Sequence, residues 1–185
     1  EGRVDYQDST EQVIDRYLSE LQAVSESTSL RDRRDRQGSG RLKITGFHVL
    51  DRLDERQKIL RSGGSYKFVI EYEKGEAGPL ENVVGSIALT DSRNEIVFLV
   101  RSNFTNENLS ISSRTGRIEC HIEDFNLAIG SYHTILYLSY GESEILDWIT
   151  NATSLVVGGG DYFGTGHPGL PTHCKVLTRA QWKAL

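Results

Sequence analysis

The sequence predicts an all-β fold, an antiparallel β-sandwich that follows a short N-terminal helix. Three observations support this prediction. Apolar and polar residues alternate along several short segments after Arg41, as they do in strands with one buried face. These segments recur at near-regular spacing, with turn residues between them and almost no helical periodicity. The chain also holds 18 glycines and only three prolines, a balance suited to many tight turns.

The short helix is expected within residues 1–24. Ser9 and Gln12 fit a capping box at its start. One apolar stripe at helical spacing follows, made of Val13, Ile14, Tyr17, Leu18, Leu21 and Val24. A single short helix cannot bury such a stripe alone, so we expect it to contact the next domain, a partner chain or an upstream domain.

Residues 25–40 are predicted to be a polar linker, and residues 41–185 to be the sandwich domain. The linker has no apolar period, and its positions 31–36 hold four arginines and two aspartates. A basic strip that contacts phosphates is one interpretation of this run. We favour a solvated spacer, because the aspartates offset half of the arginines and no aromatic residue lies among them. Residues 41–185 are therefore expected to fold without residues 1–40.

Alternation within the domain is clearest from Tyr66 to Glu73. Further strands are expected at residues 42–49, 85–89, 96–100, 118–122, 132–140 and 154–157. Tyr132 follows a turn at Gly130 and is expected to enter the core, where its hydroxyl would bond to the backbone. The same alternation buries Thr134, Leu136 and Leu138 and turns His133, Ile135 and Tyr137 outward. This pattern is typical of an immunoglobulin-like or jelly-roll-like sandwich.

Composition and charge exclude several classes of function. The net charge of −5 argues against bulk attraction to nucleic acid or anionic lipid. No apolar run is long enough to cross a bilayer, and no signal-peptide pattern is found at the start. The two cysteines are too few for a disulfide scaffold and are expected to be reduced. Asn-x-Ser/Thr triplets at Asn103, Asn108 and Asn151 are interpreted as accidental.

No catalytic, nucleotide-binding or metal site is predicted. Residues 164–169 match the dinucleotide fingerprint, but Pro168 and Pro171 forbid the helix that the fingerprint needs. Cys-His neighbours at 120–121 and 173–174 suggest zinc, yet adjacent strand residues point to opposite faces. Paired carboxylates of the glycosidase kind are left open by the sequence. We expect no enzyme activity and no cofactor.

The tail of the chain resembles that of a known family. Residues 161–166, Asp-Tyr-Phe-Gly-Thr-Gly, lie between the strand-like residues 154–157 and Trp182. With the turn at 91–94 and the Gly-Ser-Tyr at 130–132, this tail resembles the C-terminal carbohydrate-binding domain of the Wzt-type ATP-binding subunit of ABC O-antigen polysaccharide exporters. The resemblance covers roughly residues 41–185, and residues 4–24 look like the connecting helix.

The resemblance implies a non-catalytic domain that binds lipid-linked O-antigen polysaccharide before export, at the cytoplasmic face of the inner membrane. It further implies a homodimer, with the ATPase domain and the transmembrane subunit of the exporter as partners in the full-length protein. No Walker A motif is present, so the chain is not expected to hydrolyse ATP. Two alternatives stay open: a ligand-free structural dimerisation or interaction module, and a secreted adhesion or lectin domain with oxidised cysteines.

Sugar-binding residues are sought among outward positions of the strands. Aromatic rings stack on the C–H surfaces of sugars, and polar groups bond to their hydroxyls. The candidates are His133, Tyr137, His121, Glu119 and Arg101. The strands at 118–122 and 132–140 are sequential, so they are either neighbours or members of opposite sheets, and the side chains converge only if they are neighbours. In the alternative interpretation, a loop or a partner subunit covers Tyr137.

Overall fold

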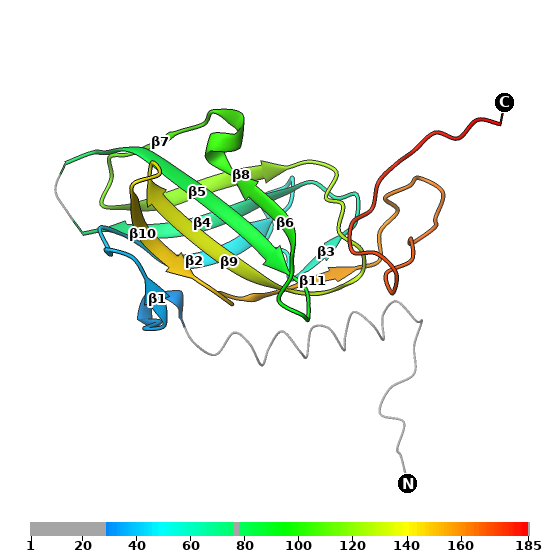
Figure 1. Ribbon diagram of the computed structural model, residues 1–185, viewed down its shortest axis with the longest axis horizontal. Helices are drawn as coiled ribbons and strands as arrows, with labels where there is room; N and C mark the ends of the chain where they lie inside the picture. The colour runs from blue at the N-terminus through cyan, green and yellow to red at the C-terminus, as the bar shows by residue number, and fades with distance from the viewer. Residues whose placement is uncertain (1–28, 76–77, 185) are drawn as a thin grey trace, which may run out of the picture.

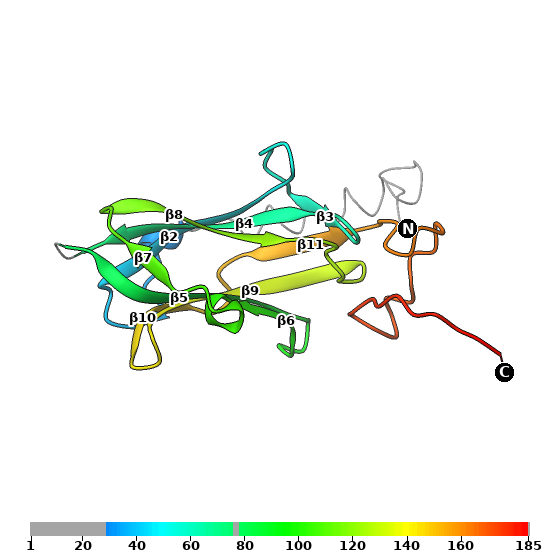
Figure 2. The same cartoon turned by 90° about the horizontal axis from the view of Figure 1, so that it is seen from above.

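Two β-sheets packed face to face form the part of the protein that the computed structural model describes, residues 29–75 and 78–184 (Figures 1 and 2). The strands are β1 (Arg36–Gln37), β2 (Leu42–Leu50), β3 (Ile59–Arg61), β4 (Tyr66–Lys74), β5 (Leu80–Thr90), β6 (Ile96–Arg101), β7 (Leu109–Ile111), β8 (Thr115–Ile122), β9 (Gly130–Tyr140), β10 (Glu144–Ile149) and β11 (Ser154–Gly158). Two 3-10 turns are described, η1 (Leu30–Asp32) and η2 (Ser102–Thr105). The predicted β-sandwich is confirmed, whereas the helix predicted within residues 1–24 lies outside the described part.

The two sheets differ in size and order. The smaller sheet has the order β2-β4-β8, and Figure 2 shows it as one layer opposite β5, β6, β9 and β10. The larger sheet is built around β9, which pairs with β5 along one edge and with β10 and β11 along the other. Strands β6 and β7 continue it beyond β5, and β1 and β3 extend it beyond β10 and β11. Among the described strand pairs, only β11 with β3 is parallel.

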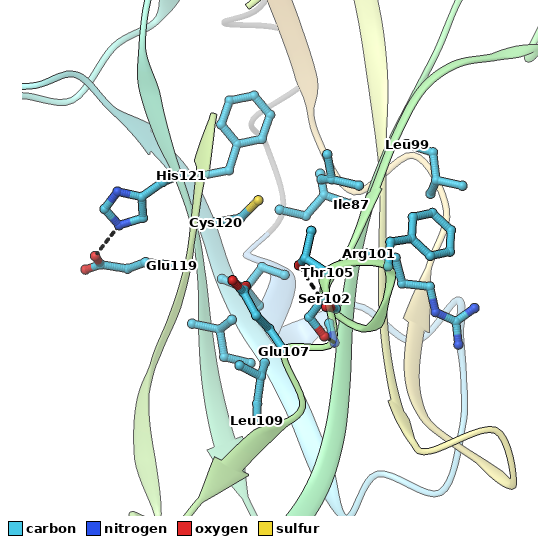
Figure 3. A pocket seen from close by; sticks show the side chains of 16 residues that line it. Ile87, Leu99, Arg101, Ser102, Thr105, Glu107, Leu109, Glu119, Cys120 and His121 are labelled. Carbon is cyan, nitrogen blue, oxygen red and sulfur yellow. Dashed lines mark hydrogen bonds and ion pairs between the residues drawn. The ribbon is translucent and has the colours of Figure 1, made fainter. Parts of the chain in front are cut away.

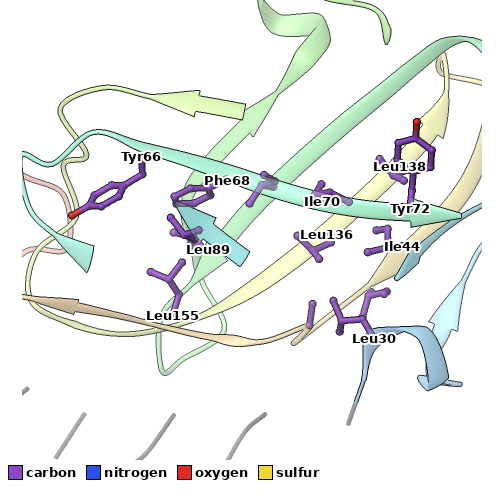
Figure 4. Close-up of a cluster of buried hydrophobic side chains, with 14 of the residues drawn as sticks. Leu30, Ile44, Tyr66, Phe68, Ile70, Tyr72, Leu89, Leu136, Leu138 and Leu155 are labelled. Atoms are coloured by element: carbon purple, nitrogen blue, oxygen red, sulfur yellow. The ribbon is translucent and has the colours of Figure 1, made fainter. Parts of the chain in front are cut away.

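The core lies between the sheets because inward positions of the strands are apolar. Figure 4 shows Phe68 and Ile70 of β4 facing Leu89 of β5 and Leu136 of β9. The predicted inward set of β9 is confirmed, since Tyr132, Thr134, Leu136 and Leu138 are all buried. Each fully buried side chain of the size of leucine or phenylalanine contributes about 1.5–3 kcal/mol relative to exposure.

Residues 29–40 contact the sandwich, within the segment 25–40 that the sequence predicts to be a polar linker. Leu30 is buried at one end of the core (Figure 4). Strand β1 pairs with β10, so that Arg36 lies opposite Ile149 and Gln37 opposite Trp148. Arg33 donates to the carbonyl oxygens of Thr150 and Asn151, at 3.2 and 3.0 Å. Arg33 thus bonds to backbone carbonyl groups and Arg36 to the Asp147 carboxylate, and the described domain therefore begins before Arg41.

The tail after β11 divides into a docked part and an exposed part. Val176 forms a β-bridge with Leu127, and the amide of Leu177 donates to the carbonyl of Asn126 at 2.7 Å. Leu177 and Tyr162 form a second buried cluster with Ala128. Beyond it, residues 178–184 are exposed, and Figure 1 shows this end leaving the sandwich. No helix in the described part of the chain is long and apolar enough to cross a membrane.

Candidate functional site

The predicted site residues lie on opposite faces of the sandwich. Strand β8 pairs with β4 in the smaller sheet, which places Glu119 and His121 on its outer face. Strands β6 and β9 belong to the larger sheet, which places Arg101, His133 and Tyr137 on the other outer face. The condition for convergence, that β8 and β9 be neighbours in one sheet, is not met. The predicted residues therefore form two separate groups.

On the larger sheet, three side chains from three strands form a continuous row. Ser86 of β5 lies opposite both Arg101 and Tyr137, and Tyr137 lies opposite Trp148 of β10. The Arg101 Cζ atom is 5.6 Å from the centroid of the Tyr137 ring. The Tyr137 and Trp148 rings meet edge to face, with centroids 6.3 Å apart and planes at 76°. We call Arg101, Tyr137 and Trp148 the aromatic row.

Trp148 is the residue of this row that sequence reasoning missed. Its strand shows no alternation, because a register shift between Ile145 and Asp147 interrupts the pairing of β10 with β9. Leu146 and Asp147 are consecutive and both buried. The tryptophan itself was the available signal, as an aromatic residue close to the predicted outward Tyr137 strand.

Polar side chains gather at the Arg101 end of the aromatic row. The Glu142 carboxylate, in the turn between β9 and β10, accepts from Arg101 Nη2 at 3.2 Å and from Asn103 Nδ2 at 3.0 Å. Two buried polar atoms beside this cluster, Arg101 Nε and Asn103 Oδ1, have no hydrogen-bond partner among the described residues. Buried polar atoms are ordinarily bonded to protein, water or ligand. The cluster therefore offers donors and acceptors, while its ion pair leaves little net charge.

The outward side chains of β5 are shorter than those beside them on β6 and β9. Its outward residues Ser86, Ala88 and Thr90 are small, and all of them are buried. Longer side chains stand on either side, because Ala88 lies between Leu99 of β6 and Ile135 of β9. The middle of this face is therefore made of short side chains, and the aromatic row crosses it near Ser86.

His133 lies on the same face as Tyr137 but nearer the C-terminal end of β5. It pairs in register with Thr90 and Ser154, and its Nδ1 atom is 3.4 Å from the Ser154 hydroxyl. Tyr137 lies four positions further along β9, which corresponds to about 13 Å. The two side chains contact one ligand together only if that ligand is longer than a single sugar.

Glu119 and His121 occupy a different environment. Glu119 pairs with Arg117 at 2.7 Å and with His121 Nε2 at 3.4 Å. Their partners in register on β4 are Val69 and Lys67, neither of them aromatic. This face supplies charge but no Phe, Tyr or Trp ring at the positions around the predicted pair.

A cleft of about 570 Å³ opens between β8 on one side and β6 with η2 on the other. Apolar side chains line most of it, among them Phe68, Ile87 and Ile118. Figure 3 shows Cys120 pointing into the cleft, whereas Glu119, His121 and Arg101 point away from it. Burial raises the pKa of the Cys120 thiol above its ordinary value. Ser102, Thr105 and Glu107 are polar groups in the lining of this cleft, and Phe104 adds one ring. The outer face of the larger sheet instead holds two rings in contact, Tyr137 and Trp148, and it is the candidate that we pursue.

The described residues hold no group of three or more His, Cys, Asp or Glu side chains arranged to bind a metal ion. Cys120 and Cys174 are both free thiols. Cys120 belongs to β8 and Cys174 to the docked tail, so each lies apart from the aromatic row.

Comparisons with known proteins add the family. A family model described as the Wzt C-terminal domain matches residues 33–169. A crystal structure of the C-terminal domain of Wzt is similar with a TM-score of 0.60 at 19% identity, over 77% of this chain and 89% of that chain, and shares its fold. A β-glucosidase from Listeria innocua in complex with gluconolactone matches at a TM-score of 0.33 and 10% identity, over 68% of this chain and 16% of that chain, too weakly to bear on the fold. No curated protein sequence matches the chain.

The matched region runs from Arg33 to Gly169 and so includes every described strand of the sandwich together with the Asp161–Gly166 loop. It begins within the arginine segment that packs on β10, in agreement with the earlier start of the domain. The chain belongs to the Wzt C-terminal domain family.

Proposed function

We propose that this domain binds a polysaccharide chain, the lipid-linked O-antigen, without changing it chemically, as the recognition part of an ABC exporter subunit. The observation that carries the proposal is the aromatic row with its adjoining Glu142 cluster. Tyr137 and Trp148 would stack on the C–H faces of sugar rings. Arg101, Asn103 and Glu142 would bond to hydroxyl groups.

Electrostatics favour a neutral glycan at this site. The Arg101 guanidinium is already paired with the Glu142 carboxylate, so the cluster presents little net charge to a ligand. A ligand that depends on hydroxyl bonds and ring stacking is only weakly affected by salt, unlike one held by opposite charge. Glu119 and His121 lie on the opposite outer face, so they belong to no part of this proposed site.

Family membership supports the partners that we propose for the full-length protein. The ATPase domain of the same subunit and the transmembrane subunit of the exporter would place this domain at the cytoplasmic face of the inner membrane. A homodimer is part of the proposal and is supported by the exposed tail, in which Trp182 is 95% exposed. Aromatic side chains of this size are enriched where proteins meet.

An array of bacterial polysaccharides probed with the whole chain tests the proposal. We expect selective retention of one O-antigen type, with binding that persists from low to physiological salt. A ligand-free dimerisation module, the second candidate, is favoured by the exposed tail alone. It predicts no retention of any glycan by a protein that is folded and dimeric, and that result would overturn the binding proposal.

A further inference from the structure

Trp148 faces outward only because β10 contains an extra residue. Leu138 and Leu136 of β9 face the core, and Tyr137 between them faces outward. Asp147 lies opposite Leu138, and Trp148 lies opposite Tyr137. In an unbroken ladder from Ile145, the next residues would place Asp147 opposite Tyr137 and Trp148 opposite Leu136. A slip of one residue exchanges the two faces of a strand, so the bulge determines that Trp148 joins the aromatic row.

The same bulge turns a carboxylate toward the core. The Asp147 side chain is 2% exposed. Burial raises the pKa of its carboxyl, while the Ile44 amide and the Arg36 guanidinium oppose that rise. An uncompensated carboxylate at such a position would favour any rearrangement that returns it to water.

Arg36 supplies the compensation. Its Nη1 atom lies 2.7 Å from Asp147 Oδ2, and the amide of Ile44 donates to the same oxygen at 2.7 Å. The guanidinium also donates to the carbonyl oxygens of Leu30, Arg33 and Ile44. The Arg36 side chain is 13% exposed, so the pair is largely removed from solvent. It joins β1, β10 and β2, and thereby both sheets.

We propose that the Arg36–Asp147 pair is a positioning device for the proposed glycan site, holding the β10 bulge in the register that places Trp148 beside Tyr137. The effect of the pair on glycan binding rests on the proposed function, whereas its effect on the position of Trp148 does not. Both residues act through Trp148 and touch no ligand. The segment before the sandwich, through Arg36, thus takes part in shaping the site.

The test uses the full chain in a Trp182→Phe background, because the sequence has two tryptophans and this leaves Trp148 alone. Near-ultraviolet circular dichroism and tryptophan emission then report the surroundings of Trp148 without any ligand. Arg36→Gln leaves the buried Asp147 carboxylate without its cationic partner. It should remove most of the Trp148 dichroic band and shift the emission of Trp148. It should also weaken binding of the O-antigen polysaccharide about tenfold or more. Adding Asp147→Asn removes the stranded charge and should restore much of both signals.

Two further variants separate positioning from general loosening. Arg36→Lys keeps a cation near Asp147 and should retain most of the Trp148 band, which provides a folded variant if Arg36→Gln does not fold. Arg33→Gln loses a neighbouring anchor to Thr150 and Asn151 and should leave the band unchanged.

The proposal is overturned if the Trp148 band survives in Arg36→Gln, is lost equally in Arg33→Gln, or is not recovered in the double variant. Loss of the band with unchanged glycan affinity also overturns it, because the pair would then not act on binding. If the parent protein binds no glycan, the proposed function fails, and the spectroscopic comparison still decides whether the pair positions Trp148.

Discussion

The hydroxyl of Tyr132 donates a 2.7 Å hydrogen bond to the carbonyl oxygen of Ala128, four residues earlier in the chain. The side chain is 1% exposed, and burial raises its pKa to about 12. Ala128 also belongs to the cluster that holds Leu177 and Tyr162 of the tail. This one bond therefore connects the start of β9 in the core with the segment on which the tail docks.

Replacing Tyr132 by phenylalanine should lower the free energy of unfolding by about 1–2 kcal/mol, because one buried bond is lost and the Ala128 carbonyl loses its donor. Urea denaturation with an unchanged m-value measures it. Tyr140→Phe is the matched control, since Tyr140 is 36% exposed, and should change stability by less than about 0.5 kcal/mol. Equal losses in the two variants would contradict the assignment of this bond.

Sequence reasoning identified the long regular strands and missed the irregular ones. Strand β9 was predicted because its inward residues, such as Leu136 and Leu138, alternate strictly with outward ones. Strand β10 was missed because its bulge places Leu146 and Asp147 on the same side, which removes the alternation. The packing of residues 29–40 was missed because arginine bonds to carbonyl oxygens leave no apolar pattern.

The candidate site was likewise predictable only in part from the sequence. Alternation alone places Tyr137 outward, and the same argument places Arg101 outward on β6. It cannot tell which sheet a strand joins, so Glu119 and His121 were grouped with residues on the opposite face. Trp148 required the register of β10 against β9, which depends on pairing across the sheet rather than on local sequence.

The aromatic row makes a graded prediction for glycan binding. Tyr137→Ala and Trp148→Ala should each weaken binding of the retained polysaccharide about tenfold or more, because each removes a stacking ring. His133→Ala should weaken binding of long chains more than that of a single sugar, since His133 lies about 13 Å from Tyr137. Isothermal titration calorimetry on the folded variants measures these affinities.

His121→Ala is the control for these variants, because His121 lies on the other outer face and its side chain is 67% exposed. It should leave affinity and fold unchanged. Binding that survives both Tyr137→Ala and Trp148→Ala, or that is lost in His121→Ala, would place the ligand elsewhere.

Two N-terminal deletions should behave differently. Removal of residues 1–28 keeps Leu30 and Arg36, and the thermal transition should stay cooperative with a similar midpoint. Removal of residues 1–40 strands the Asp147 carboxylate, which costs about 3–5 kcal/mol. The loss of the buried Leu30 side chain adds about 2 kcal/mol to this destabilisation, because the apolar surface that Leu30 covers becomes exposed. Domains are stable by only about 5–15 kcal/mol, so the shorter fragment should be marginal.

Differential scanning calorimetry on both fragments measures this difference. A marginal 41–185 fragment would contradict the expectation from sequence that residues 41–185 fold independently. A 41–185 fragment as stable as the 29–185 fragment would show that neither β1 nor Leu30 contributes to the domain.

His48 predicts a loss of stability in mild acid. Its Nδ1 atom is 3.4 Å from Glu71 Oε1, and burial, with the nearby Arg56 charge, lowers the pKa of the imidazole below its usual 6.5. Glu71 opposes this shift, and Arg117 adds to it. Because the unfolded chain takes up the proton more readily, the stability contributed by neutral His48 is present above about pH 6.5 and falls as the pH drops toward the folded pKa.

Urea unfolding at pH 7.5 and pH 5 should show a smaller decrease in the free energy of unfolding for His48→Gln than for the parent protein. Parallel decreases would mean that other groups, such as carboxylates common to both proteins, account for the whole effect.

The exposed tail predicts how the protein assembles. Arg179 still contacts the domain, with its Cζ atom 4.5 Å from the Tyr162 ring centroid and its Nε donating to the Tyr162 carbonyl at 2.9 Å. The residues after it make no such anchor to the described sandwich, and Trp182 is 95% exposed. An extended segment with an exposed tryptophan is suited to bury that ring, and to pair its backbone, on a second copy.

Truncation after Arg179 should therefore give a folded monomer. The substitution Trp182→Ala should raise the dimer dissociation constant. The thermal stability of the domain should change little in both variants. Truncation after Val157 also removes Tyr162 and Leu177 from the second buried cluster, and should give monomers or insoluble protein. Light scattering across a concentration series distinguishes these outcomes. A chain ending at Arg179 that dimerises as tightly as the parent would exclude the tail from the interface. The edge strands β6 and β8, each of which leaves one side unpaired in the described sheets, would then be the next surfaces to consider.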